Sequence, residues 1–224
     1  MKKIILLVFM ISSFLSLWGQ IKPKLHFSAT NEYHFAWYNG MVTIGNSAHL
    51  DEDSGPKSYI FPTGKSEKDL LCISSNYEKL RKNIQHFAWF KDGTVSMGQY
   101  SRTPAKISLA NGRSPYRFVL APGKTMEDVL CISSNSDMHF AWYKDGTVSA
   151  GKSTNLANER SPYRFVLAPG KTVIDVICIS SNDDMHFAWY KDGTVSAGSS
   201  DNLASKRQPY PFRLGFNKNL KEIL

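Results

Sequence analysis

Three cysteines and one histidine occupy the same position of an internal repeat, and they are the first residues that could do chemistry. The string Cys-Ile-Ser-Ser-Asn begins at Cys72, Cys131 and Cys178, and His26 stands at the corresponding place near the start of the chain. Three cysteines and one histidine form a known zinc ligand set, so these four residues are candidates for a metal site. The favoured interpretation is different, because buried free cysteine commonly behaves as a small core residue. We therefore expect reduced, buried cysteines without disulfides, no metal and no cofactor.

Arginine and tyrosine recur together in three of the four repeats, on either side of a Ser-Pro or Gln-Pro pair. A guanidinium fork can bind paired hydroxyls or a carboxylate, and a tyrosine offers an apolar ring and a hydroxyl, which suits a sugar. The divergent first repeat has Ser54 and Lys57 instead. Positions that three repeats keep and the fourth changes are candidates for a ligand surface. The alternative is that the arginine only solvates the loop and the tyrosine packs on the proline. The candidate ligand-binding residues are Arg113, Tyr116, Arg160, Tyr163, Arg207 and Tyr210.

Other motifs argue against catalysis. Pro-Gly-Lys-Thr at 122–125 and 169–172 lacks the first glycine of a phosphate-binding loop, so nucleotide binding is rejected. The acidic segment 51–55 misses the spacing of a calcium loop. Asp69, Asp128 and Asp175 each follow a Gly-Lys segment and are expected to tie that turn. Every notable polar residue is repeated, whereas catalytic sites are usually single constellations, so we expect a protein that is not an enzyme.

The string His-Phe-Ala-Trp marks the repeat, and its histidines allow two interpretations. It begins at His34, His86, His139 and His186. Four equivalent histidines could ring a channel and bind a metal or an anion. The favoured interpretation is that each histidine is hydrogen-bonded within its own unit, because buried polar groups find partners. The tryptophans of the same strings are expected in the core.

The spacing of these strings predicts four short strands per unit. His139 and His186 are 47 residues apart, and insertions in 77–85 and between Gly98 and Leu109 lengthen the second unit. A hairpin is expected over 139–143 and 147–151, joined by Lys-Asp-Gly, with further strands over 163–167 and 176–180. Four strands per roughly 47–50 residues are typical of propeller blades. The predicted fold class is therefore all-β, with four units in a closed ring.

The two ends of the chain have complementary phase. Segment 211–224 aligns to 117–130, just before a Cys position, and Leu25-His26-Phe27-Ser28 aligns to Leu130-Cys131-Ile132-Ser133. Pairing of the terminal strands would seal the ring and remove an exposed sheet edge. An open solenoid would carry atypical caps instead, and a β-trefoil would need threefold repetition. The expected domains are a signal peptide over 1–19 and one repeat domain over 20–224, with units near 25–71, 72–130, 131–177 and 178–224.

The N-terminal segment predicts that the protein is exported. Lys2 and Lys3 precede the apolar run 4–11, which serine residues then dilute, so a cleaved signal peptide is favoured over an anchor. The formal net charge is +8, spread along the chain, and 42% of residues are hydrophobic. This excess favours anionic surfaces but gives no support for nucleic acid. We expect a secreted, periplasmic or cell-surface protein that is monomeric and has no stable membrane insertion.

Segments 141–149 (AWYKDGTVS) and 162–171 (PYRFVLAPGK) resemble repeats of secreted bacterial proteins. In architecture the chain resembles small repeat-built propellers of the tachylectin and hemopexin types. The predicted function is a secreted, non-catalytic, multivalent binding protein, possessing lectin-like affinity for carbohydrate, with a glycan or a cell-surface protein as partner. A protein-binding scaffold or adhesin is the alternative, and a hydrolase with its site at the channel mouth is the third hypothesis. Repetition of weak sites would give avidity.

Overall fold

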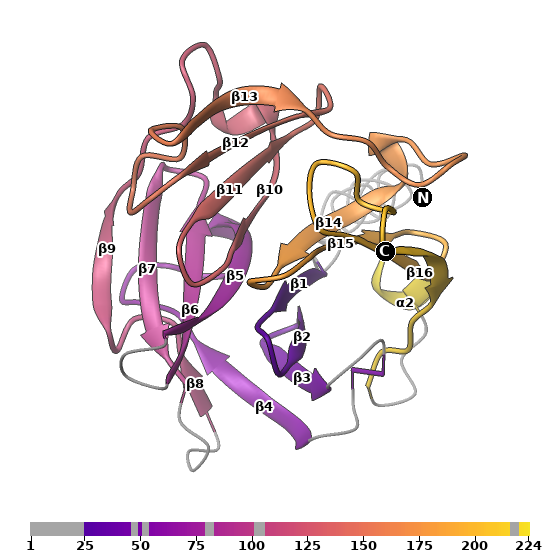
Figure 1. The fold of residues 1–224 in the computed structure, drawn as a ribbon. Coiled ribbons are helices and arrows are strands. Elements are labelled where there is room, and N and C mark those ends of the chain that lie inside the picture. Colours follow the sequence, from indigo (N-terminus) through magenta and orange to yellow (C-terminus); the bar gives the residue numbers. More distant parts are fainter. Residues whose placement is uncertain (1–24, 46–48, 51–53, 79–82, 101–105, 216–219) are drawn as a thin grey trace, which may run out of the picture.

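The chain folds into a β-propeller of four blades, as predicted (Figure 1). The computed structural model describes residues 25–45, 49–50, 54–78, 83–100, 106–215 and 220–224. The expected signal peptide lies outside these residues. The strands of each blade are given from the axis to the rim. The first blade contains β1 (His26–Ala29), β2 (His34–Tyr38), β3 (Met41–Gly45) and β4 (Ser54–Ile60), and the second contains β5 (Leu70–Glu78), β6 (Asn83–Phe90), β7 (Thr94–Gln99) and β9 (Arg113–Arg117). The third contains β10 (Val129–Ser134), β11 (His139–Tyr143), β12 (Thr147–Gly151) and β13 (Arg160–Arg164), and the fourth contains β14 (Val176–Ser181), β15 (His186–Tyr190), β16 (Thr194–Gly198) and β17 (Arg207–Pro211).

Smaller elements connect the blades. Strand β8 (Lys106–Ser108) extends the first blade by pairing with β4. Single 3-10 turns precede the innermost strands of the other blades, and a short helix occupies the corresponding place at the end of the chain. They are η1 (Glu67–Asp69), η2 (Met126–Asp128), η3 (Val173–Asp175) and α2 (Leu220–Ile223).

The β-hairpins form where the sequence predicts them. In the third blade, the backbone N–H and the hydroxyl of Thr147 both donate to Asp145, at 3.1 and 2.7 Å, and Gly146 has a φ of +82°. Glycine adopts this left-handed conformation without a steric penalty. In the first blade, Asn39 and Gly40 both have positive φ, at 52° and 70°, which is the requirement of a two-residue hairpin.

The outermost strand differs from the prediction. It runs over 160–164 in the third blade, rather than 163–167, and the other blades show the same shift. Pro162 falls inside the strand, which is tolerated because an outermost strand has one edge without a partner. A bulge accompanies it, since Val148 pairs with Tyr163 while Ala150 pairs with Arg160.

The innermost strands surround the axis and are almost entirely buried (Figure 1). The strand predicted last in each unit is therefore the first strand of the next blade. The cysteine of each such strand bridges to its neighbour: the N–H of Ile179 donates to Cys131 Sγ at 3.0 Å. Cys131 Sγ in turn lies 3.6 Å from the carbonyl oxygen of Ile179. The four repeat tryptophans are fully buried, as expected.

A polar relay crosses the interface between adjacent blades. Trp89 Nε1 donates to Ser74 Oγ at 2.8 Å, Ser74 lies 2.6 Å from Ser134 of the next blade, and Ser134 lies 2.7 Å from His139 Nδ1. If each hydroxyl donates toward the histidine, every donor in the relay has an acceptor. The predicted bond between each histidine and its own unit is thereby confirmed for the last three blades.

The relay recurs at three of the four interfaces. The same order of groups joins the first blade to the second and the third to the fourth. At the interface of the fourth and first blades, Trp189 donates to Ser180, but Ala29 stands where the next serine would be. Nδ1 of the buried His34 consequently has no hydrogen-bond partner.

The ring closes where the two ends of the chain meet, but by a different device from strand pairing. Strand β1 pairs with β2 of its own blade rather than with the C-terminal strand. The Phe27 ring stacks on Trp189 at 4.3 Å and meets Phe212 edge-on at 5.3 Å. The closure therefore rests on packing between complete blades, together with the backbone staple of the C-terminal segment that is described next.

Backbone staples link each blade to the next around the ring. Val119 bridges to Asn155, Val166 to Asn202 and Arg213 to His49, all in parallel orientation. Between the first and second blades, the longer pairing of β4 with β8 takes this place. The last staple, in which the N–H of Leu50 donates to the carbonyl of Arg213 at 3.0 Å, uses the C-terminal segment to seal the ring.

Candidate functional site

The three predicted Arg–Tyr pairs lie on the outermost strands β9, β13 and β17 of their blades. Residues three apart on a regular strand point to opposite faces, but the bulge in each of these strands turns both side chains to one side. The guanidinium carbon then lies over the tyrosine ring centroid, at 3.8 Å for Arg113, 3.5 Å for Arg160 and 3.6 Å for Arg207. The structure thus brings together each predicted pair within its own blade.

This geometry corrects one detail of the sequence interpretation. Each tyrosine is half-buried, and its arginine covers a ring face that we expected a sugar to contact. The exposed group is the guanidinium itself, which lies over the ring. Burial raises the pKa of the Tyr163 hydroxyl, and the positive charge of Arg160 opposes that rise. The pair therefore offers a fixed cation to a ligand, rather than an aromatic platform.

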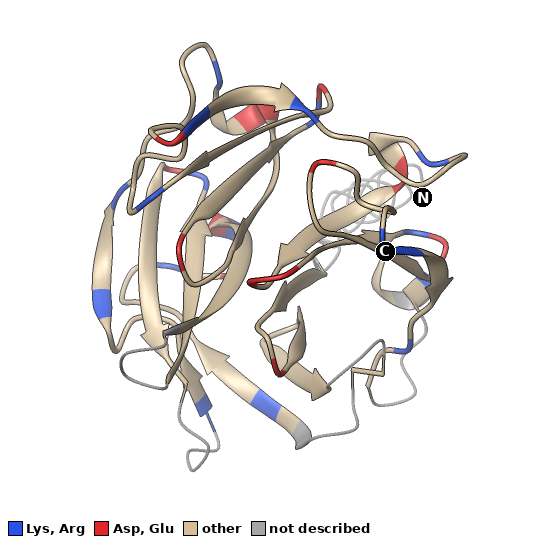
Figure 2. Cartoon of the chain, viewed as in Figure 1, with Lys and Arg blue, Asp and Glu red and all other residues tan. Residues whose placement is uncertain are grey.

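The strands that carry the pairs are positively charged. Strands β9 and β13 each hold a second exposed arginine, Arg117 and Arg164, and neither strand contains an acidic residue (Figure 2). Acidic groups do lie nearby: Glu159 forms an ion pair with Lys152 at 3.7 Å. Asp201 of the fourth blade also contributes a charge that raises the pKa of Tyr163. Each of the three sites thus has its own stacked arginine, but the charged groups around it differ from site to site.

The first blade lacks an Arg–Tyr pair, as its sequence predicts. Lys57 stands at the tyrosine position, and its Nζ donates to the hydroxyl of Tyr100 of the second blade at 3.0 Å. The same ammonium lies 4.9 Å from the centroid of the Tyr100 ring. This cation is engaged in joining two blades.

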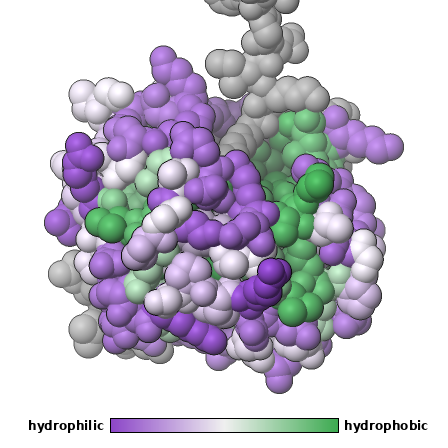
Figure 3. Space-filling model, turned by 90° about the horizontal axis from the view of Figure 1, so that it is seen from above, coloured by the Kyte–Doolittle hydropathy of each residue, from purple (hydrophilic) through white to green (hydrophobic). Residues whose placement is uncertain are grey.

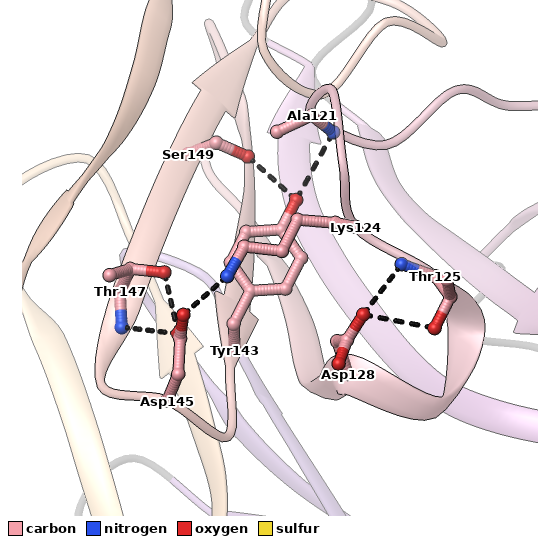
Figure 4. Close-up of polar contacts among 8 residues, drawn as sticks. All are labelled: Ala121, Lys124, Thr125, Asp128, Tyr143, Asp145, Thr147 and Ser149. Carbon is pink, nitrogen blue, oxygen red and sulfur yellow. Dashed lines mark hydrogen bonds and ion pairs between the residues drawn. The ribbon is translucent and has the colours of Figure 1, made fainter.

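A lysine in the connection between two blades pairs with an aspartate in the hairpin of the next blade, and we call this contact the lysine clamp (Figure 4). The sequence analysis did not identify it. Lys124 forms an ion pair with Asp145 and lies over the buried Tyr143 ring, with 4.7 Å from Nζ to the centroid. Equivalent lysines, Lys65 and Lys171, pair with Asp92 and Asp192. The recurrence of Gly-Lys before each hairpin was the available signal. The clamp ties the connection between blades to the hairpin and leaves its lysine unavailable to a ligand.

The predicted tie of the Gly-Lys turn by aspartate is confirmed. Asp128 accepts hydrogen bonds from the backbone N–H and the hydroxyl of Thr125, at 2.8 and 2.9 Å (Figure 4). These bonds are the main cause of the lowered pKa of the Asp128 carboxyl. Asp69 and Asp175 make the same bonds to Ser66 and Thr172. These carboxylates therefore have a structural role in the turn.

The cysteines and histidines are placed deep in the ring. Within the part of the chain that the structure describes, no group of three histidine, cysteine or acidic residues is arranged to hold a metal ion. Cys72, Cys131 and Cys178 are buried and form no disulfide, and burial raises the pKa of the Cys131 thiol. Their sulfur atoms bond to the neighbouring strand, as described above, which gives them a role in packing.

Each repeat histidine packs edge-on against the aromatic residues of the preceding blade. His139 lies 4.8 Å from Phe87 and 5.2 Å from Trp89, measured between ring centroids. Burial lowers the pKa of His34, His139 and His186 to about 4 and that of His86 to about 3. The histidines are accordingly neutral at physiological pH and act as contacts between blades.

No protein-family model and no curated protein sequence matches the chain. Solved propeller structures are similar at low identity. PorZ of Porphyromonas gingivalis is 14% identical over 85% of this chain and 28% of its own, with a TM-score of 0.31. The WD40 domain of Toxoplasma gondii coronin is 14% identical over 78% of this chain and 42% of its own (TM-score 0.36), and BamB of Moraxella catarrhalis 11% over 82% and 50% (TM-score 0.33). This chain spans half or less of the length of each of these proteins, and the similarity is one of fold alone.

The described residues contain no helix that is long and apolar enough to cross a membrane. Seen from above, most of the surface is hydrophilic, with apolar residues gathered in a band on the right and in a smaller patch on the left (Figure 3). The large apolar residues that are most exposed are Ile60, Val119, Val166 and Ile174. Three of these occupy equivalent positions of the repeat: Ile60 ends β4, and Val119 and Val166 follow β9 and β13.

Proposed function

We propose that this protein is a secreted, non-catalytic, multivalent binding protein whose three Arg–Tyr pairs bind carbohydrate that carries carboxylate groups. The observation that supports this most directly is that one pair recurs in the same geometry on three outermost strands. In each pair the guanidinium carbon lies 3.5–3.8 Å from the centroid of the tyrosine ring. These arginines are exposed to solvent, so packing of the core does not require their stacked geometry.

The chemistry of the pair favours an acidic ligand. A guanidinium presents its N–H groups as a rigid fork that matches a carboxylate in two parallel, charge-assisted hydrogen bonds. Stacking on tyrosine restricts the side chain before the ligand arrives, which reduces the entropy that binding would otherwise cost. A second arginine on β9 and β13, Arg117 and Arg164, adds attraction for a polyanionic chain. Uronate-containing polysaccharides combine these features.

The placement of the sites determines how multivalency would act. Strands β9, β13 and β17 are the outermost strands of three different blades, so the three sites lie at different places around the ring. A flat surface could reach only one of them well. The arrangement instead suits a flexible polymer that wraps around the rim, or the bridging of separate chains, because avidity requires a span that the ligand can cover.

A protein-binding scaffold is the second candidate, and exposed apolar side chains favour it. Val119 and Val166 are 57% and 54% exposed, and each follows its Arg–Tyr strand by two residues. An apolar contact beside an arginine is a common composition for the centre of a protein interface. A protein partner that contacts several blades would be distinguished from glycan by its dependence on both valines.

The test is an array of acidic and neutral glycans, followed by calorimetry with the ligand that the array identifies. Arg160→Ala should remove one site, and the combined change of Arg113, Arg160 and Arg207 to alanine should reduce affinity at least a hundredfold. Arg164→Ala is the matched control, because it removes the same charge from the same strand but leaves the stacked pair in place. Arg160→Lys keeps the charge and loses the fork.

The outcomes separate the alternatives. Loss in the stacked-arginine variants with a much smaller loss in Arg164→Ala supports a specific site. Equal loss in Arg160→Ala and Arg164→Ala would reduce the interaction to general charge attraction. Undiminished binding by the triple variant would contradict the proposal.

A further inference from the structure

A pocket lies where the two irregular parts of the repeat meet, between the first and second blades. Its volume is about 430 Å³, which is within the range of small-molecule sites. One wall comes from the connection that follows β4. The other comes from the end of β8, from the segment that follows it and from β9. The lining residues are Phe61, Pro62, Thr63, Ser108, Ala110, Asn111, Ser114 and Pro115.

The pocket depends on features that the other blade interfaces lack. Phe61 occupies a position at which the other units have Leu120, Leu167 and Leu214. The insertion before Leu109 supplies β8, which pairs in parallel with β4 over three residues, whereas the other interfaces have single bridges. The N–H of Leu109 also donates to the carbonyl of Ile60 at 2.9 Å. The departures from the repeat therefore build one wall each of the same hollow.

Two polar side chains of the pocket, Asn111 and Ser108, are held in position by hydrogen bonds. The Asn111 side chain accepts from the Gln99 N–H at 2.6 Å and donates to the Gln99 carbonyl at 3.4 Å. Because an amide has two N–H donors, one remains for a ligand. Ser108 Oγ accepts from the N–H of Ala110 at 3.3 Å, which leaves the hydroxyl proton to donate. Fixed donors of this kind reduce the entropic cost of binding.

The apolar wall is also supported. The Phe61 ring meets Tyr59 edge-on at 5.3 Å and lies 6.4 Å from Phe90, so the half-buried ring is fixed from behind. Pro62, Pro115 and Ala110 add apolar surface without flexible side chains. None of the eight lining residues is charged. An aromatic face beside hydroxyl and amide groups, without charge, matches the alternating C–H and hydroxyl surfaces of a neutral sugar ring.

We propose that this pocket binds a neutral sugar ring, as a single site distinct from the three Arg–Tyr pairs. The Phe61 ring would contact the C–H face of the sugar, and Asn111, Ser108, Thr63 and Ser114 would bond its hydroxyls. The site would not depend on the arginines, although Ser114 and Pro115 lie between Arg113 and Tyr116 in β9. It gives the second blade a ligand preference that the repeated units do not share.

The test is titration of the ¹⁵N-labelled mature protein with methyl glycosides of glucose, galactose and mannose, followed by amide chemical shifts. At least one glycoside should produce saturable shifts that are confined to 61, 63, 108, 110, 111 and 114. Ser114→Trp fills the pocket and should weaken binding at least tenfold. Ser161→Trp makes the same change at the equivalent exposed position of β13 and should leave binding unchanged. Phe61→Leu, which introduces the residue of the other units, should weaken binding severalfold.

Two further results would separate this site from the Arg–Tyr proposal. Arg113→Ala should leave the glycoside shifts intact, so the pocket can be verified even if the arginines bind nothing. The proposal is overturned if no glycoside gives saturable shifts, if both tryptophan variants lose binding equally, or if uncharged proline dipeptides bind at these amides and glycosides do not.

Discussion

Single residues at the interface of the first and fourth blades show most clearly what holds the ring together. Ala29 interrupts a relay that serines complete at the other three interfaces, and it leaves His34 Nδ1 buried without a partner. An unsatisfied buried polar atom costs about 1–3 kcal/mol. The chain therefore contains three internal controls for the contribution of one hydroxyl group.

Replacing the alanine tests the relay directly. Ala29→Ser should place a hydroxyl between Ser180 and His34 and raise the free energy of unfolding by about 1 kcal/mol. Ser134→Ala, which breaks a complete relay, should lower it by about 1–3 kcal/mol. Urea denaturation measures both. If Ala29→Ser is neutral and Ser134→Ala is also neutral, the relay contributes nothing to stability.

The buried histidines predict a loss of stability in acid. Their pKa values are lowered by burial to about 4, and to about 3 for His86, whereas an unfolded chain protonates histidine near pH 6.5. The unfolded state thus binds more protons below pH 6.5, so stability is fully present above that pH and falls as pH decreases toward 4. Urea midpoints at pH 7.5, 6 and 5 should decrease in that order. His139→Gln should reduce the slope, and an unchanged slope would exclude this histidine as a contributor.

The thiols provide a third prediction at this scale. Because Cys72, Cys131 and Cys178 are buried thiols that hydrogen-bond to neighbouring strands, they should not react with a thiol reagent in the native protein. Denaturation without a reducing agent should expose three reactive thiols. Fewer than three would reveal a disulfide, and rapid reaction in the native state would contradict their burial.

At the scale of elements, the sequence predicted the hairpins and the innermost strands, but it placed the outermost strand at 163–167 instead of 160–164. Asp145-Gly146 and Asn39-Gly40 carry their turn chemistry locally, and 176–180 is a continuous apolar and β-branched run. Pro162 misplaced the outermost strand, because nothing local shows that this strand has a free edge. The stacking of Arg160 on Tyr163 depends on the bulge, and the pocket depends on segments about 50 residues apart, so neither could be predicted from spacing.

The first strand is the element on which closure depends most. Phe27 of β1 stacks on Trp189 and meets Phe212, and both contacts join the first blade to the last. Phe27→Ala should lower the free energy of unfolding by about 3–5 kcal/mol. Unfolding should remain a single transition, because all four blades share one ring. Two separate transitions, followed by fluorescence and circular dichroism, would indicate blades that unfold independently.

At the scale of the whole molecule, the C-terminal segment completes the ring. It supplies Phe212, the Arg213 staple and the buried Ile223. A chain that ends at residue 211 should therefore lose cooperative unfolding and expose the first blade to proteolysis. Arg213→Ala changes an exposed side chain of the same segment and keeps the backbone carbonyl that makes the staple, so it is the control and should unfold as the parent protein does. A truncated chain with an unchanged melting temperature would show that closure is dispensable.

The central claim is that three equivalent Arg–Tyr pairs bind an acidic carbohydrate, and the number of bound ligands tests it most directly. Calorimetry of the mature protein with a short uronate oligosaccharide should give a stoichiometry of three, because the first blade has Lys57 engaged with Tyr100 and no stacked arginine. Arg113→Ala, Arg160→Ala and Arg207→Ala should each reduce the value to two. A stoichiometry of four, or a value that the three substitutions leave unchanged, would contradict the account.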